Sequence, residues 1–181
     1  MVVVYFILSL FSIEQENRYI IQNSKIEFYS YAPLEDIQAV NTESVGAIDI
    51  ESGEFIIKIP VNAFEFPNKL MQKHFNDSYL ETDIYPECIF RWKINENSAS
   101  GEITLHGVTK KIEIPISKTI NEENIIISTD FKILLKDHKI KIPRLLFQNI
   151  AEEIEIKVSS EFIKYKKEWE LELQEHQEWW E

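Results

Sequence analysis

Apolar side chains recur at every second position over most of the chain, which is the pattern of β-strands that bury one face. The positions between them are mostly charged or polar, so each strand is expected to keep one face in water. Residues 51–54, 95–101, 106–108 and 121–124 carry turn-forming side chains and separate the runs. This order predicts sequential antiparallel strands. The apolar phases are Ile26/Phe28, Phe55/Ile57/Ile59, Cys88/Phe90/Trp92/Ile94, Ile103/Leu105, Ile112/Ile114/Ile116, Ile125/Ile127, Phe131/Ile133/Leu135 and Ile154/Ile156/Val158.

One stretch departs from this alternation and predicts a short helix flanked by aromatic residues. It covers residues 64–90, FEFPNKLMQKHFNDSYLETDIYPECIF. Pro67 suits the first turn of a helix, where its missing N–H has no partner in any case. Leu70, Met71, His74 and Phe75 then recur at helical spacing. Because so short a helix is marginal alone, its apolar stripe is expected to dock onto the strands as a lid or wall.

Length and charge narrow the class of protein. The chain has 181 residues without an internal shift in composition before its last fifteen or so, which predicts a single domain. A formal net charge of −12 argues against nucleic acid or an anionic membrane as a partner. Cys88 is the only cysteine, so an internal disulfide is excluded. Its place in the apolar phase of a strand indicates a small buried hydrophobe.

The two ends of the chain differ from its middle. Residues 2–11 are apolar apart from Ser9, a run too short to span a bilayer but suited to the core of a signal peptide. No basic residue precedes the run, which leaves a truncated signal peptide, the favoured interpretation, or an apolar first strand. We expect a signal peptide at 1–16, a barrel domain at 17–166 and an acidic, tryptophan-rich extension at 167–181. For that extension, a frayed tail and docking of its tryptophans both stay open.

Motifs for catalysis or metal binding are not found. His74, His106, His138 and His176 lack the close spacing of a zinc or copper site, so we predict no metal and no cofactor. His106 ends a strand beside the Gly107 turn, where an imidazole commonly caps backbone groups. The chain has four glycines and neither a G-x-S-x-G nor a Cys–His motif, so we predict that it is not an enzyme.

Periodicity leaves a sandwich and a barrel both open, and a family resemblance favours the barrel. Residues 64–90 match F-x-F-x-x-x-L-M-x-x-H-F-N-x-x-Y-[ML]-E-[ST]-x-x-Y-P-x-[AC]-x-F, and blocks at 32–41, at 101–110 and at 140–143 followed by 150–154 agree in order. From about Tyr19 to Tyr165 the chain resembles YceI-like proteins, which are lipocalin-like polyprenyl-binding proteins of the bacterial periplasm. The resemblance implies an exported, periplasmic, mainly β protein: an extended antiparallel lipocalin-like β-barrel of about eight strands with a short helix between strands.

The resemblance also implies a ligand, an amphiphilic lipid such as a polyprenyl chain or isoprenoid quinone, held in an apolar cavity by burial rather than reaction. An apolar lining suits such a chain because an unpaired polar group would oppose its burial. Two alternatives remain: a non-catalytic protein-interaction barrel with a filled core and, less favoured, a lipid-modifying enzyme. The oligomeric state stays open, a dimer included. The residues expected to line or cover the cavity are Phe28, Phe55, Phe64, Phe66, Leu70, Met71, Phe75, Tyr79, Phe90, Trp92, Leu105, Phe131 and Ile156.

Overall fold

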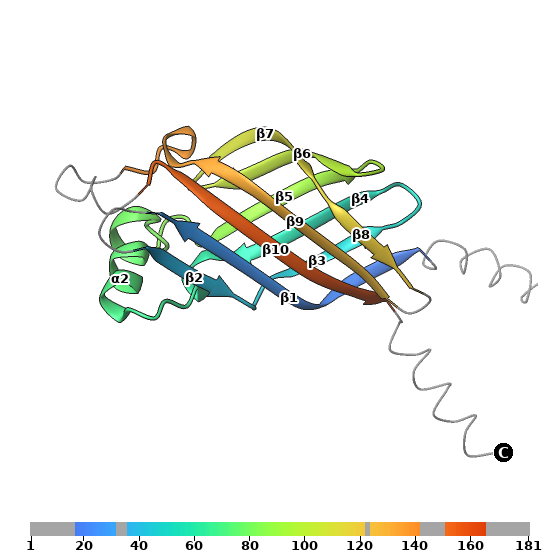
Figure 1. Ribbon diagram of the computed structural model, residues 1–181, viewed down its shortest axis with the longest axis horizontal. Coiled ribbons are helices and arrows are strands. Elements are labelled where there is room, and N and C mark those ends of the chain that lie inside the picture. The colour runs from blue at the N-terminus through green and yellow to red at the C-terminus, as the bar shows by residue number, and fades with distance from the viewer. Residues whose placement is uncertain (1–16, 32–35, 122–123, 142–150, 166–181) are drawn as a thin grey trace, which may run out of the picture.

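Ten antiparallel strands form one sheet in the computed structural model, which describes residues 17–31, 36–121, 124–141 and 151–165 (Figure 1). The strands are β1 (Arg18–Ser30), β2 (Ile37–Asn41), β3 (Val45–Asp49), β4 (Glu54–Pro60), β5 (Glu87–Ile94), β6 (Ser98–Leu105), β7 (Val108–Pro115), β8 (Ser117–Ile120), β9 (Asn124–Leu134) and β10 (Glu153–Lys164). The short helical elements are η1 (Val61–Ala63), α2 (Lys69–His74), the π-helical turn η2 (Phe75–Tyr79) and η3 (Leu135–His138).

The sheet curls into a half-barrel, and we refer to this curled sheet as the barrel. Its strand order is β7-β6-β5-β4-β3-β1-β10-β9-β8, with β2 paired to β1 beside this path. The edge strands β7 and β8 follow each other in the chain with only Ile116 between them, so one continuous stretch supplies both edges. The predicted mainly β, lipocalin-like antiparallel barrel with a short helix is confirmed. Ten strands occur rather than about eight because β2 and β3 share one flank of β1 and that one stretch divides at Ile116.

The longest strands, β1 and β10, form the spine of the barrel. Their ladder runs from Tyr19 opposite Lys164 to Tyr29 opposite Glu155. Phe28 faces Ile156 across it, and both are buried. β-branched and aromatic side chains pair well on the inner face of such a sheet, which is why this alternation folds as strands.

Residues 61–86, which we call the strap, cross one end of the barrel between β4 and β5 and carry α2 (Figure 1). Their two ends lie together, because Val61 N donates to Pro86 O at 2.8 Å. A backbone bridge ties the strap to β2: Val40 N donates to Glu65 O at 3.1 Å, and Glu65 N donates to Val40 O at 2.8 Å. The strap therefore closes over the barrel end with one side fixed to the sheet.

Helix α2 begins two residues later than Pro67, where the sequence placed its first turn. Asn68 is its N-cap, and the side-chain oxygen accepts hydrogen bonds from the N–H groups of Leu70 at 2.9 Å and Met71 at 3.2 Å. An asparagine in this position satisfies two N–H groups that the first helical turn leaves without partners. Pro67 therefore lies just before the cap.

The expectation that Leu70 docks with the rest of the apolar stripe is wrong, because its side chain is 63% exposed. Met71 and Phe75 lie four residues apart on one face, and that face turns toward the core. Leu70 lies about 100° round the helix from Met71 and shares the solvent face with His74, which is also exposed. Only half of the predicted stripe is therefore inside.

The expectations for the chain ends, a signal peptide at 1–16 and an extension at 167–181, lie outside the described residues. Within the described residues, the helices are all too short or too polar to span a bilayer.

Candidate functional site

An apolar cavity of about 100 Å³ lies inside the barrel beneath the strap, and its accessible wall is entirely apolar. Strands β1, β2, β4, β5, β6, β9 and β10 supply the wall, and the strap covers it. Ser30 is the one aliphatic hydroxyl of this lining, and its oxygen accepts a hydrogen bond from Ala151 N at 2.9 Å. The full lining is Ile26, Phe28, Ser30, Ile37, Ile59, Val61, Phe64, Phe66, Met71, Phe75, Tyr79, Leu80, Cys88, Phe90, Ile103, Leu105, Ile133, Leu135, Ile140, Ile154 and Ile156.

Four phenylalanines, Phe28, Phe64, Phe66 and Phe75, pack together in this wall; we call them the phenylalanine cluster. Phe75 of η2 stacks on Phe28 of β1 with ring centroids 5.5 Å apart, and it lies 4.9 Å from Phe66. Phe64 meets both Phe28 and Phe75 edge to face. Three of the four rings come from the strap, so the strap fills much of the space that the strands enclose.

A second, smaller cavity of about 30 Å³ lies deeper in the barrel. Ile26, Ile59 and Phe90 line both cavities, so the two adjoin along the barrel interior. Phe55, Trp92 and Phe131 surround the smaller one with edge-to-face contacts among themselves and Phe90. The indole N–H of Trp92 donates to Glu102 O at 3.0 Å, so the polar atom of this aromatic wall is paired.

The structure brings most of the residues expected from the sequence together at these two cavities. Phe28, Phe64, Phe66, Met71, Phe75, Tyr79, Phe90, Leu105 and Ile156 line the larger one, and Phe55, Trp92 and Phe131 line the smaller. Leu70 contacts neither. The sequence did not indicate Ile37, Val61, Leu80 or Ile140, which lie in short elements or connections where no alternation marks the inner face.

The cavity offers little chemistry beyond burial. None of the residues that line it carries a charge. Cys88 is buried, as expected, and burial raises the pKa of its thiol to about 12, so the unreactive protonated form prevails at neutral pH. Burial also raises the pKa of the Tyr79 hydroxyl. The described residues contain no cluster of three side chains that could hold a metal ion.

Several solved structures share this fold at low sequence identity. A polyisoprenoid binding domain from Saccharophagus degradans, implicated in plant cell wall breakdown, matches with 14% identity and a TM-score of 0.72 over 83% of this chain and 100% of that one. BcnA from Burkholderia cenocepacia matches with 15% identity and a TM-score of 0.68 over 76% and 95%. The YceI protein of Campylobacter jejuni matches with 20% identity and a TM-score of 0.54 over 68% and 81%.

A comparison with curated proteins found no match. The profile of the YceI-like domain matches residues 21–162, from the first half of β1 to near the end of β10. This range contains the strap and all the residues that line the two cavities. By that match, and in agreement with the fold and the four sequence blocks, the chain belongs to the YceI-like domain family.

Proposed function

We propose that this protein binds an amphiphilic lipid with an isoprenoid chain in the cavity beneath the strap. The observation that carries the proposal is the wholly apolar wall of a cavity that a separate segment covers. The family supports it, and so does the neighbour described as a polyisoprenoid binding domain. Export to the periplasm is part of the proposal and rests on the family together with the apolar run at residues 2–11.

The volume of the cavity limits how an isoprenoid chain could bind in it. Its volume of about 100 Å³ is smaller than the roughly 300–1,000 Å³ of pockets that hold drug-sized ligands. A bound chain must therefore displace the phenylalanine cluster and open a way toward the smaller cavity. Each buried methylene contributes about 0.8 kcal/mol, so roughly ten carbons would supply about 8 kcal/mol before ordering costs, the scale of micromolar affinity.

Binding without catalysis is the form of function that this wall supports. General acid–base or nucleophilic chemistry needs an ionisable or nucleophilic group aimed at the ligand. Among the residues that line the cavity, the candidates are the Cys88 thiol, the Tyr79 hydroxyl and the Ser30 hydroxyl. Burial raises the pKa of Cys88 and of Tyr79. Ser30 accepts a hydrogen bond from Ala151 N, and the lining holds no histidine or carboxylate that could activate it.

A protein-interaction barrel with a filled core is the second candidate. The small volume and the tight ring contacts of the phenylalanine cluster favour it, because close packing leaves little room for a ligand. Such a barrel would act through its outer surface and would carry no lipid.

Substitution of Phe75 distinguishes the two candidate functions. If a ligand displaces the phenylalanine cluster, Phe75→Ala should weaken lipid retention. The same variant should lower the free energy of unfolding by about 3 kcal/mol, the lower end of the usual range for aromatic truncation. Phe131→Ala, on β9 in the smaller cavity, should lower it by nearer 5 kcal/mol, since four surrounding strands hold the void open. Urea unfolding measures stability, and native mass spectrometry of gently purified protein measures copurified lipid.

A parent protein that carries no lipid and takes up no added prenyl alcohol, with equal and large losses of stability in both variants, would overturn lipid binding in favour of the filled barrel. Ligand uptake also has a second readout. A prenyl alcohol at about a hundred times its dissociation constant should stabilise the parent by roughly 2.7 kcal/mol.

A further inference from the structure

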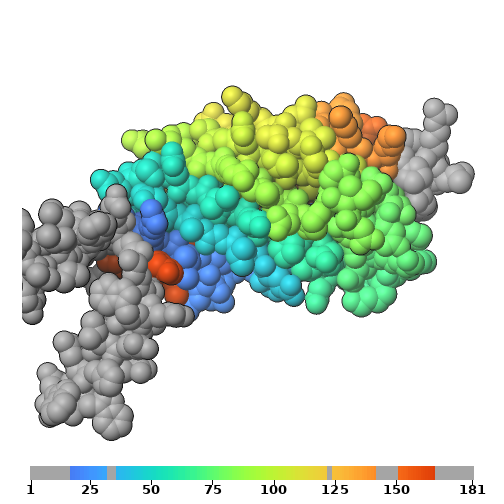
Figure 2. Space-filling model, turned by 180° about the vertical axis from the view of Figure 1, so that it is seen from behind, coloured from blue at the N-terminus to red at the C-terminus, as the bar shows by residue number. Residues whose placement is uncertain are grey.

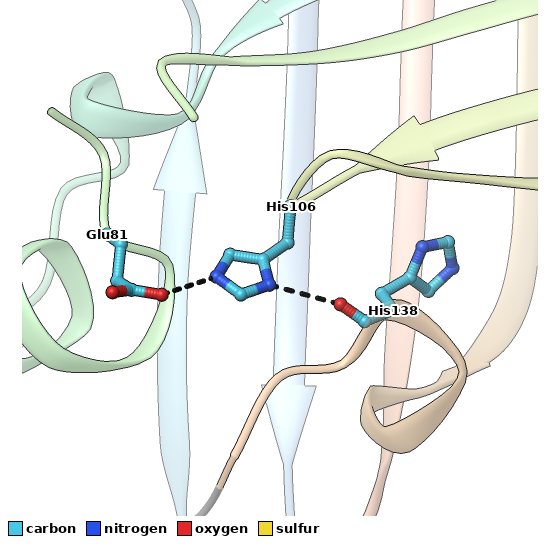
Figure 3. Close-up of polar contacts among 3 residues, drawn as sticks. All are labelled: Glu81, His106 and His138. Carbon is cyan, nitrogen blue, oxygen red and sulfur yellow. Dashed lines mark hydrogen bonds and ion pairs between the residues drawn. The ribbon is translucent and has the colours of Figure 1, made fainter. Parts of the chain in front are cut away.

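Three segments that are distant in the sequence meet at the strap end of the barrel (Figures 1 and 3). They are the strap at Glu81, the β6–β7 turn at His106, and η3 at His138. Figure 2 shows the strap (green) and η3 (orange) at the same end of the molecule. His106 lies between the other two and contacts both: its Nε2 is 2.9 Å from Oε2 of Glu81, and its Nδ1 is 3.1 Å from the carbonyl oxygen of His138.

The two contacts of His106 are with groups that accept hydrogen bonds. A backbone carbonyl can only accept a hydrogen bond, and so can an ionised carboxylate. Both ring nitrogens of His106 therefore face acceptors, and only the imidazolium, with an N–H on each nitrogen, satisfies both.

The surroundings of His106 hold its side chain in a defined position. Its side chain is only 9% exposed, and the Tyr85 ring packs against it with centroids 4.4 Å apart. Glu81, His106 and Lys139 are the three non-glycine residues with positive φ in the described part of the chain, at 46°, 51° and 57°. Such conformations persist where surrounding contacts hold them. Here all three residues border the place where the strap, the β6–β7 turn and η3 meet, which we call the junction.

The contact of His106 with Glu81 is one of two hydrogen-bonded attachments between the strap and the rest of the described chain. The other is the backbone bridge between Val40 and Glu65. Leu80 and Leu105, the chain neighbours of Glu81 and His106, line the cavity. The attachment between His106 and Glu81 therefore borders the cavity directly, and its Glu81 side chain is partly exposed. The attachment between Val40 and Glu65 is a pair of backbone hydrogen bonds.

We propose that the imidazolium of His106 is a latch that holds the strap over the cavity, and that the strap opens at its Glu81 side to admit the ligand. The ligand part of this inference rests on the proposed function. His106 is thus a positioning residue, which acts on the ligand through the strap. The bond to the His138 carbonyl keeps His106 itself in place while the strap moves.

Two variants of Glu81 test the latch without any ligand. In Glu81→Gln the amide can donate to Nε2 of a neutral His106 ring, so the strap should stay closed while the ring loses its charge. In Glu81→Ala the contact is lost. Ring ¹⁵N NMR at neutral pH, assigned with His106→Gln, should show an imidazolium in the parent and a neutral ring in Glu81→Gln.

Amide hydrogen exchange then reports opening of the strap. The N–H groups of Leu80, Thr82 and Tyr85 make hydrogen bonds within the strap. They should exchange about tenfold faster in Glu81→Ala, as expected for loss of one charged hydrogen bond, and near the parent rate in Glu81→Gln. The matched control is Glu153→Ala, which removes an ion pair with Lys132 from a side chain of similar exposure, 47%, without touching the strap.

Release of a fluorescent prenyl alcohol extends the test to the ligand and should also be about tenfold faster in Glu81→Ala alone. A neutral His106 ring in the parent, or unchanged exchange in Glu81→Ala, would overturn the latch. A full exchange effect without binding of the probe by the parent would leave the latch standing and refute the proposed function.

Discussion

At the residue scale, His138 is the most deeply buried ionisable side chain of the junction, with 1% of its surface exposed. Its Nδ1 lies 3.2 Å from Val108 O, so the ring joins η3 to the first residue of β7. Desolvation lowers the pKa of His138 below its ordinary value of 6.5, and nearby backbone carbonyls oppose this only in part. The folded protein therefore holds this ring neutral.

This burial predicts a loss of stability on mild acidification. Well above pH 6.5 the ring is neutral in both states, so it adds no pH dependence there. Below pH 6.5 the unfolded chain takes up a proton that the folded protein does not, so the free energy of unfolding falls as the pH falls toward the lower folded pKa. Urea midpoints measured at pH 7.5 and 5 show this fall as the difference between the parent and a variant without a titrating side chain at position 138.

His138→Gln is the matching variant, because glutamine can still donate to Val108 O but does not titrate. The fall between pH 7.5 and 5 should be smaller in this variant than in the parent. The same slope in both proteins would show that His138 does not contribute to it. At more acid pH a separate loss is expected, because hydrogen bonds from Ser52 lower the pKa of Asp49 below 3.8 and this contribution disappears as Asp49 protonates.

At the element scale, α2 depends on its cap because it has only six residues. Asn68→Ala should lower the free energy of unfolding by about 1 kcal/mol, since two N–H groups lose their acceptor. Asn97→Ala is the control: this side chain is exposed in the β5–β6 turn and makes no side-chain hydrogen bond among the described residues, so a change within about 0.5 kcal/mol is expected. Equal midpoints for the two variants in urea would contradict the role of the cap.

The elements that the sequence predicted well are those with a long alternating pattern. β1, β4, β5 and β10 follow the expected phases, because one wet and one dry face leave a period of two. β2, β3 and β8 have only four or five residues, too few for a period to show. The phases at Ile125 and Phe131 belong to one strand, β9. Thr129 lies between them and lines the smaller cavity, and its hydroxyl donates a hydrogen bond to Pro115 O.

The sequence predicted one part of the candidate site, the strap, but not the contacts of His106. The aromatic residues of 64–90 identified the strap, since so many large rings in a short segment must be buried. The sequence could not reveal the junction at His106, because Glu81 and His138 are 25 and 32 residues away from it and only the fold brings them together.

At the scale of the whole molecule, the spine of the barrel ends before residues 167–181 begin. The ladder between β1 and β10 ends at Tyr19 and Lys164, and Tyr165 N donates to Arg18 O at 2.9 Å. Removal of residues 167–181 should therefore leave the urea midpoint and lipid retention nearly unchanged. A large loss of stability in the shortened protein would show that the tryptophans of the extension contribute to the core.

The pairing of β1 with β10 also governs when the barrel can form. The first described strand finds its main partner about 140 residues later in the chain, so the native contacts have a large sequence separation. Proteins dominated by such contacts fold slowly, in milliseconds to seconds, because a long loop must close before the contacts can form. During synthesis the ladder between β1 and β10 therefore cannot form until β10 has left the ribosome. A secretion channel threads unfolded chains, so a barrel whose main ladder forms last suits the proposed export.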